Sequence, residues 1–347
     1  MRKMPFFILL LILFFQSCSF LEDTDELVYM EYDGAYLPIY SRGNKDSDVV
    51  ILWTHGGPGS SGMYYGDIDE ISSLHNDYHI IYWDQLSSGG SMGNPDKDDF
   101  TVENFSNQLD GVVNIVNNRY KPKKLYLLGH SWGGYLVSYY LADSVEHQEN
   151  FEGLILLNPI LDIPRALTTS IEDVDKYAKD KISIGEEVDF WKDALDWYSE
   201  NLTDTGILIG ENIATHYDFI EETGGMLKKR DRNDELEFEL GIKMALFSPF
   251  HFYNYYSNQS NIRTYLQIED ASLDNVKHNG DQTLSNITIR TLFIAGEDDK
   301  IASIKMSEDW EGQFGSTVQF KDYSDCAHAA FLDRPEMFLD DIRGFAK

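Results

Sequence analysis

A serine flanked by glycines follows a run of apolar residues in the first half of this 347-residue chain. Residues 124–128 are typical of a buried strand, Ser131 stands in the pattern Gly-His-Ser-Trp-Gly, and residues 131–142 continue as an apolar, proline-free helix. Strand, sharp turn and helix in this order raise a serine hydroxyl above the edge of a sheet, and side chains in place of the glycines would strike the neighbouring strand and helix. We therefore predict that Ser131 is a nucleophile.

A serine hydroxyl is a poor nucleophile until a base removes its proton, and the base needs an acid to orient it. When the serine lies on a strand–turn–helix unit of this kind, the acid and then the histidine follow it along the chain. The strand expected to include residues 291–295 ends in a turn with three acids, Glu297, Asp298 and Asp299. His328 is the last histidine and lies between the last expected strand and the last expected helix. These positions predict His328 as the base and one of the three acids as its partner.

An acyl-transfer reaction also needs backbone N–H groups aimed at the oxyanion that forms in the transition state. One such group is expected from Trp132, the residue after the serine. The other is expected from the sequence His55-Gly-Gly-Pro-Gly59, which follows an apolar strand, and we assign it to Gly57. We expect His55 to brace this loop rather than to act as a base.

Strand-like and helix-like segments alternate along most of the chain, which implies a mostly parallel central sheet with helices on both faces. Strands are expected at 49–54, 78–83, 124–128, 151–157, 289–295 and 317–323, with a hairpin over 27–40, and helices at 102–120, 131–142, 305–313 and 335–345. Residues 159–285 are rich in acids and aromatics and have helical periodicity. We expect them to form a helical cap inserted between two core parts, 27–158 and 286–347.

Charge and composition exclude several classes of function. The chain has 59 acidic and 28 basic residues, a formal net charge of −31, and 42% hydrophobic residues, as in a globular protein. Such a surface repels nucleic acid and anionic lipid headgroups, so we expect no nucleic-acid partner and contact with a membrane only through a lipid anchor. No group of potential ligands has the spacing of a metal site, and the glycine-rich segments fit loops around an oxyanion better than a nucleotide site. No cofactor is indicated, and the sequence leaves the oligomeric state open.

The N-terminus has the pattern of an export signal. A basic head is followed by the apolar run 5–15 and by Gln-Ser-Cys18, a run too short to span a bilayer comfortably. The cysteine after a small residue resembles the signal of a bacterial lipoprotein. We therefore expect residues 1–17 to be removed, Cys18 to be lipidated, and residues 18–26 to tether the protein to the bacterial cell envelope. Ordinary secretion and a retained anchor are the alternatives. The second cysteine, Cys326, is interpreted as a packing residue rather than a thiol with a chemical role.

Three motifs together resemble the proline iminopeptidase branch of the α/β-hydrolase superfamily. They are the His55–Gly59 loop, the run Tyr-Trp-Asp-Gln-Leu-Ser-Ser-Gly-Gly-Ser at 82–91, and the serine turn, and the similarity covers residues 49–158 and 289–347. The resemblance implies the α/β-hydrolase fold with a helical cap over the site. It also favours Asp299 over Asp298 as the acid, because related sequences place the acid three residues after the turn glycine.

The resemblance implies a serine hydrolase that works through an acyl-enzyme and releases N-terminal residues, often proline, from a short peptide or an aminoacyl amide. In this family acidic cap residues hold the free amine, and the candidates here are Glu186, Glu187, Glu221 and Glu222.

Three departures from the family pattern leave other substrates open. An expected Arg-Gly pair is replaced by Leu86-Ser87, His130 stands where the aminopeptidases usually have glycine, and Leu332 stands where they often have an acid, one residue before Asp333. Histidine before the serine is common in esterases and lipases of this fold, so a carboxylesterase or another small acyl hydrolase is the alternative. A surface binding protein that kept the fold without catalysis is a third hypothesis.

Overall fold

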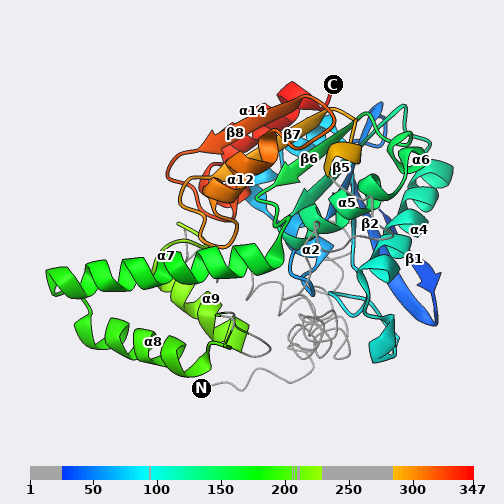
Figure 1. Cartoon of the computed structure of the whole chain (residues 1–347). Coiled ribbons are helices and arrows are strands. Elements are labelled where there is room, and N and C mark those ends of the chain that lie inside the picture. Colours follow the sequence, from blue (N-terminus) through cyan, green and yellow to red (C-terminus); the bar gives the residue numbers. More distant parts are fainter. Residues whose placement is uncertain (1–25, 94, 205, 207, 209–211, 229–283) are drawn as a thin grey trace, which may run out of the picture.

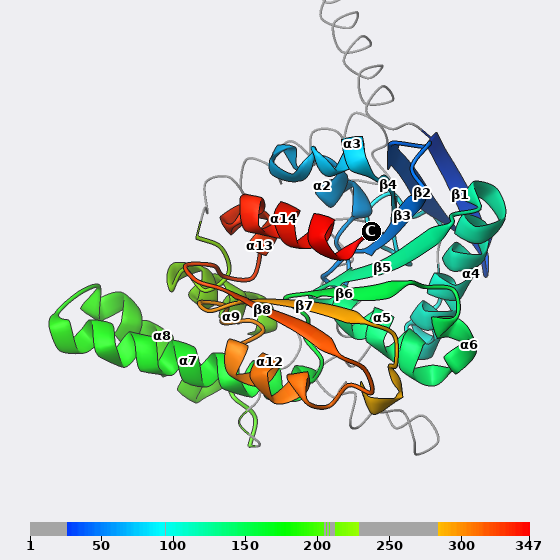
Figure 2. The same cartoon turned by 90° about the horizontal axis from the view of Figure 1, so that it is seen from above.

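A single twisted sheet of eight strands forms the centre of the described part of the chain (Figures 1 and 2). The computed structural model describes residues 26–93, 95–204, 206, 208, 212–228 and 284–347. The strands are β1 Glu26–Tyr32, β2 Ala35–Gly43, β3 Val49–Thr54, β4 His79–Trp83, β5 Lys124–His130, β6 Gly153–Leu157, β7 Thr291–Gly296 and β8 Val318–Tyr323. Their order across the sheet is β1-β2-β4-β3-β5-β6-β7-β8. Strand β2 is antiparallel to both of its neighbours, and the strands from β4 to β8 pair in parallel. The predicted mostly parallel sheet is confirmed.

Helices cover both faces of this sheet. The helices are α2 Gly62–Gly66, α3 Leu74–Asp77, α4 Val102–Tyr120, α5 Trp132–Asp143, α6 Val145–Gln148, α7 Ile163–Ile184, α8 Val188–Asn201, α9 Asn212–Glu222, α12 Ile304–Glu311, α13 Ala330–Asp333 and α14 Pro335–Phe345. Helices α2, α3, α13 and α14 lie on one face, and α4, α5, α6 and α12 lie on the other (Figure 2).

Every residue of the central strand β3 is buried, which explains its uninterrupted apolar run. Val50 and Leu52 belong to the core on the side of α4. Ile51 and Trp53 belong to the core on the side of α14. A strand that is covered on both faces buries every side chain, so it lacks the alternation of a half-exposed strand.

The parallel register brings the chemically important loops to one edge of the sheet. Thr54 at the end of β3 lies opposite Gly129 of β5, and His130 lies opposite Leu157 of β6. Strand β7 ends at Gly296, beside β6. In an open α/β sheet, ligands bind at the carboxyl ends of the strands. The loops that follow β3, β5, β6 and β7 therefore meet where a site is expected.

Part of the predicted cap is described, and it is helical. Helix α7 begins with the Asp162 side chain accepting a hydrogen bond from the Arg165 N–H and ends at Gly185, whose φ is 80°. Helices α7 and α8 project beyond the sheet as a pair (Figures 1 and 2). The His216 ring of α9 contacts the Tyr198 hydroxyl of α8 at 2.6 Å and the Ser170 hydroxyl of α7 at 2.9 Å. Residues 229–283 lie outside the described residues, so the boundaries of the cap stay a prediction.

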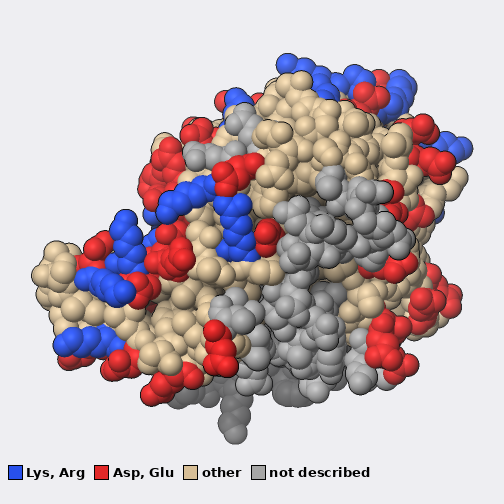
Figure 3. Space-filling view, viewed as in Figure 1, with Lys and Arg blue, Asp and Glu red and all other residues tan. Residues whose placement is uncertain are grey.

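Acidic side chains are spread over the face shown in Figure 3 rather than gathered in one patch. This distribution agrees with the interpretation of the net charge of −31 as a solvated acidic surface. Among the described residues, we find no helix with the length and apolar character needed to cross a membrane. The segment 1–25, with the predicted lipidation site Cys18, lies outside the described residues.

Candidate active site

Ser131 lies at the sharp turn between β5 and α5, as its motif predicts. Its backbone has φ 55° and ψ −122°, in the left-handed region that side-chain-bearing residues rarely adopt. A hydrogen bond of 3.0 Å from the Ser131 N–H to the Leu157 carbonyl stabilises the turn. A Cβ atom at Gly133 would lie 2.3 Å from the Thr54 carbonyl oxygen, which explains the glycine two residues after the serine.

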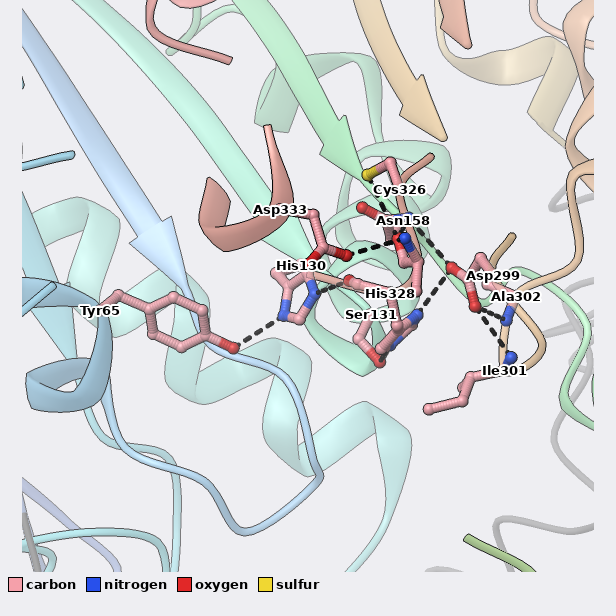
Figure 4. Close-up of polar contacts among 11 residues, drawn as sticks. Tyr65, His130, Ser131, Asn158, Asp299, Ile301, Ala302, Cys326, His328 and Asp333 are labelled. Atoms are coloured by element: carbon pink, nitrogen blue, oxygen red, sulfur yellow. Dashed lines mark hydrogen bonds and ion pairs between the residues drawn. The ribbon is translucent and has the colours of Figure 1, made fainter. Parts of the chain in front are cut away.

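A line of hydrogen bonds joins Ser131 to a histidine and a carboxylate (Figure 4). The distance from Ser131 Oγ to His328 Nε2 is 2.8 Å, and the distance from His328 Nδ1 to Asp299 Oδ2 is 2.8 Å. Because a carboxylate only accepts, Nδ1 carries the hydrogen, and the unprotonated Nε2 of the neutral ring faces the serine hydroxyl. This arrangement can draw a proton from Ser131. The three predicted residues are brought together.

The structure distinguishes among the three acids of the turn. Asp299 is buried, and its Oδ1 atom accepts hydrogen bonds of 2.8 Å from the N–H groups of Ile301 and Ala302. Asp298 instead forms an ion pair of 3.0 Å with Lys228 and is partly exposed, and Glu297 is exposed. Asp299, and not Asp298, is therefore the acid that is hydrogen-bonded to His328.

The two residues predicted to stabilise an oxyanion flank the serine. The loop after β3 approaches Ser131 so closely that a Cβ atom at Gly56 would lie 3.1 Å from Ser131 Cβ. Gly57 follows with φ 116°, a conformation that favours glycine. Trp132 opens α5, and N–H groups in the first turn of a helix have no partner within the helix. The assignment of Gly57 and Trp132 as oxyanion donors stays a prediction.

His55 and Gln85 brace the loop of residues 55–61 after β3. We call it the oxyanion loop, because Gly57 is predicted to donate to the oxyanion. Gln85 donates its backbone N–H to His55 Nε2 at 3.1 Å and its side-chain amide to the His55 carbonyl at 2.9 Å. The side-chain oxygen of Gln85 accepts from Trp132 Nε1 at 2.9 Å, so one amide ties the loop to the serine turn. Burial lowers the pKa of His55 to about 4, so the ring is neutral near pH 7. These contacts agree with the bracing role expected for His55. The role of Gln85 was missed, although its Asp-Gln motif after β4 marked the position.

Asp84 organises the loop that carries Gln85. Its carboxylate is buried and accepts hydrogen bonds from the hydroxyls of Tyr40 and Ser61 and from the N–H groups of Gly62 and Gly90, at 2.6 to 3.0 Å. Burial raises the pKa of this carboxyl to about 6.

Asn158 and Asp333, whose roles the sequence did not suggest, contact the acid and the loop that carries His328. This loop, residues 324–329, is called the histidine loop. Asn158, directly after β6, donates to Asp299 Oδ2 at 3.0 Å and to the Ala327 carbonyl at 3.1 Å. Asp333 accepts from the Ala327 N–H at 2.9 Å. Cys326 is buried in the same loop, and burial raises its pKa well above the ordinary value, which agrees with a packing role.

The candidate cap acids lie in two places. Glu186 and Glu187 are exposed at the turn between α7 and α8, at the end of the cap farthest from the sheet (Figure 1). Glu221 and Glu222 end α9, a few residues before Met226, whose carbonyl accepts the His328 N–H at 3.0 Å. The structure thus does not bring the first pair to the triad, and it places the second pair close in sequence to a contact with His328. Within the described part of the chain, we find no group of three or more potential ligands that could hold a metal ion.

The buried neutral histidines predict a loss of stability on acidification. Burial lowers the pKa of His55 to about 4, of His130 to about 3 and of His216 to about 4, from an ordinary 6.5. Between pH 6.5 and 4, the unfolded chain binds these three protons and the folded protein does not, so acid favours unfolding. Asp84 acts in the opposite direction between pH 6 and 3.8, because its carboxyl is protonated first in the folded state. We expect the free energy of unfolding to fall by roughly 3 kcal/mol per pH unit between pH 6 and 4.

Chemical denaturation at about pH 6 and about pH 4 measures this change. Calorimetry in buffers of different ionisation enthalpy should show a net uptake of about two protons on unfolding near pH 5. A stability that does not depend on pH over this range, or a release of protons on unfolding, would contradict the prediction.

Comparisons with known proteins show the family to which the chain belongs. The family model for the alpha/beta hydrolase fold matches residues 49–335. A proline iminopeptidase of Lactobacillus acidophilus is 24% identical over 315 residues, which cover 90% of this chain and 94% of that protein. A proline iminopeptidase of Lactobacillus helveticus is 33% identical over 132 residues, which cover 38% of this chain and 42% of that protein.

Solved structures share the fold at low sequence identity. The proline iminopeptidase of Mycobacterium smegmatis superposes with a TM-score of 0.57 at 16% identity, covering 92% of this chain and 97% of that one. An esterase from a Rhodococcus species superposes with a TM-score of 0.58 at 17% identity, covering 92% of this chain and 98% of that one. The expectations of this fold and of a hydrolase are confirmed. The chain therefore belongs to the α/β-hydrolase fold family and is similar to the proline iminopeptidases within it.

Proposed function

We propose that this protein is a serine hydrolase that acts through an acyl-enzyme, with Ser131 as nucleophile, His328 as base and Asp299 as its orienting acid. The observation that carries the proposal is the hydrogen-bonded line of these three side chains at the carboxyl edge of the sheet. The preferred substrate is a short peptide or aminoacyl amide with a free amino terminus. The proline iminopeptidase of Lactobacillus acidophilus, similar over 94% of its length, supports this choice.

The proposed reaction follows from the geometry. Ser131 Oγ attacks the substrate carbonyl carbon while His328 Nε2 takes the hydroxyl proton, and Asp299 stabilises the imidazolium. The N–H groups of Gly57 and Trp132 stabilise the oxyanion. Collapse of the tetrahedral intermediate breaks the bond to the amine, which leaves with the proton from Nε2. Water then attacks the acyl carbon while His328 Nε2 takes one of its protons. Nε2 returns this proton to Ser131 Oγ as the bond between Oγ and the acyl carbon breaks and the acid product leaves.

An amine-binding group is needed for aminopeptidase specificity. Of the four candidate acids, we favour Glu221 and Glu222. They precede Met226 by only a few residues, and the Met226 carbonyl accepts a hydrogen bond from the His328 N–H. A carboxylesterase is the alternative function. It is favoured by His130, the residue before the nucleophile, and the structural likeness to the Rhodococcus esterase is compatible with it.

A small substrate panel tests the choice between amide and ester. We expect turnover of the 2-naphthylamides of proline and alanine, and little turnover of their N-acetylated forms, which lack the amine. Short nitrophenyl esters serve as the comparison. Ester turnover without amide turnover would establish the esterase instead, and inactivity toward the whole panel would favour the non-catalytic binding protein.

The location of the enzyme is part of the proposal. Export and lipidation at Cys18, supported by the apolar run and the Gln-Ser-Cys ending, would hold it at the bacterial cell envelope. Incorporation of a labelled fatty acid that persists in Cys18→Ala would refute the assignment of this cysteine.

A further inference from the structure

A second chain of hydrogen bonds reaches His328 from the side away from Asp299 (Figure 4). The Gly56 N–H lies 3.1 Å from the Tyr65 hydroxyl, which lies 2.8 Å from His130 Nδ1. His130 Nε2 lies 2.9 Å from the backbone carbonyl of His328. Tyr65 and His130 are both buried, with 2% and 7% of their surfaces exposed, so water does not compete freely for these bonds.

The two ends of this chain determine where its hydrogens lie. The Gly56 N–H can only donate, so the Tyr65 oxygen accepts there and its own hydrogen is free to be donated to His130 Nδ1. The His328 carbonyl can only accept, so His130 Nε2 carries the hydrogen. His130 is therefore in one neutral tautomer, and burial lowers its pKa to about 3. All three bonds run in the same direction, from the oxyanion loop to the histidine loop.

Three of the four members belong to the proposed machinery or directly precede one of its residues in the sequence. Gly56 precedes Gly57, His130 precedes Ser131, and the last acceptor is the backbone of His328 itself. The aromatic ring of Phe331 packs at 5.5 Å from the Tyr65 ring and 5.2 Å from the His130 ring, centre to centre. Two side chains, those of Tyr65 and His130, thus join three loops that are far apart in sequence.

We propose that Tyr65 and His130 are positioning residues of the hydrolysis, which set the oxyanion loop and the histidine loop relative to Ser131 through one continuous chain of hydrogen bonds. This inference rests on the proposed function. Substrate binding in the ground state does not depend on this chain of hydrogen bonds. Proton transfer and oxyanion stabilisation, in contrast, need both the oxyanion loop and the histidine loop in place. Loss of either member therefore lowers kcat and leaves KM nearly unchanged. Because one broken link disconnects the loops, the two losses are not additive.

Two conservative substitutions test the proposal. Tyr65→Phe removes one oxygen and keeps the ring, and His130→Gln can still donate to the His328 carbonyl but gives up the imidazole acceptor of Tyr65. Each is expected to lower kcat, and the rate of labelling by a fluorophosphonate, by about 10-fold, with KM within about twofold. The double variant should be no more than about twofold slower than the slower single variant.

Tyr198→Phe is the matched control, because it also removes a buried phenol–imidazole hydrogen bond, of 2.6 Å to His216, but within the cap helices. We expect it to lower the unfolding midpoint as much as Tyr65→Phe does, with kcat unchanged. Unchanged kcat in folded Tyr65→Phe and His130→Gln, or fully additive losses in the double variant, would overturn the positioning role. If instead the wild-type enzyme neither labels nor turns over the panel, the proposed function itself fails. The two failures are therefore distinguishable.

Discussion

Ser131→Ala is expected to lower kcat by about 10⁴-fold to 10⁶-fold while KM changes little. The substitution removes the only atom proposed to bond to the substrate carbon, and what remains is binding and oxyanion stabilisation. Alanine fits the turn no worse than serine does, because both must adopt the same left-handed backbone, so the fold should be kept. Steady-state kinetics on the best substrate of the panel measure the effect.

The neighbouring helix offers a control for this variant. Ser138 of α5 is fully buried, and its hydroxyl has no hydrogen-bond partner among the described residues. Ser138→Ala removes a hydroxyl from the same helix without touching the triad, so it should keep wild-type kcat. If Ser131→Ala were as active as Ser138→Ala, Ser131 would not be the nucleophile.

Asp299→Asn is expected to lower kcat by about 10⁴-fold, because an amide no longer holds His328 in the tautomer that accepts the serine proton. The carboxylate also accepts from two backbone N–H groups and from Asn158. An amide has one accepting oxygen, so its NH₂ group must face a donor, and we expect an additional loss of about 1–3 kcal/mol in the free energy of unfolding. Kinetics and chemical denaturation of the same preparation separate the two effects.

Asp298→Asn provides the comparison one residue away. Asp298 is partly exposed and paired with Lys228, and an ion pair at such a site contributes at most about 1 kcal/mol. We expect nearly wild-type kcat. A greater loss of activity in Asp298→Asn than in Asp299→Asn would reverse the assignment of the acid.

The sequence predicted the elements whose signal is local. The apolar run 49–54 is β3, and the helical spacing over 102–120 is helix α4, which buries Phe105, Leu109 and Val116. The predicted ends of strands and helices were less accurate, because pairing with neighbouring elements determines where an element begins and ends. Strand β7 begins at Thr291 instead of 289, where its pairing with Leu154 of β6 starts. The short helices α2, α3, α6 and α13 were not predicted, since four or five residues carry too little periodicity.

The site was predictable where motif and chain order specify it. The turn around Ser131 and the order of acid and histidine pointed to the residues that the structure joins. Tyr65 and Asn158 could not be found in this way, because each lies at least 65 positions from its partners His130 and Asp299. No local pattern records such distant contacts, and they become visible only when the sheet brings the loops to one edge.

Labelling of the folded enzyme with a fluorophosphonate, followed by mass spectrometry of its peptides, tests whether Ser131 is an activated nucleophile. We expect a single adduct, carried by Ser131, which is formed rapidly in the wild type and is nearly lost in His328→Ala. Labelling of another residue, or no labelling of protein shown to be folded, would mean that Ser131 is not an activated nucleophile.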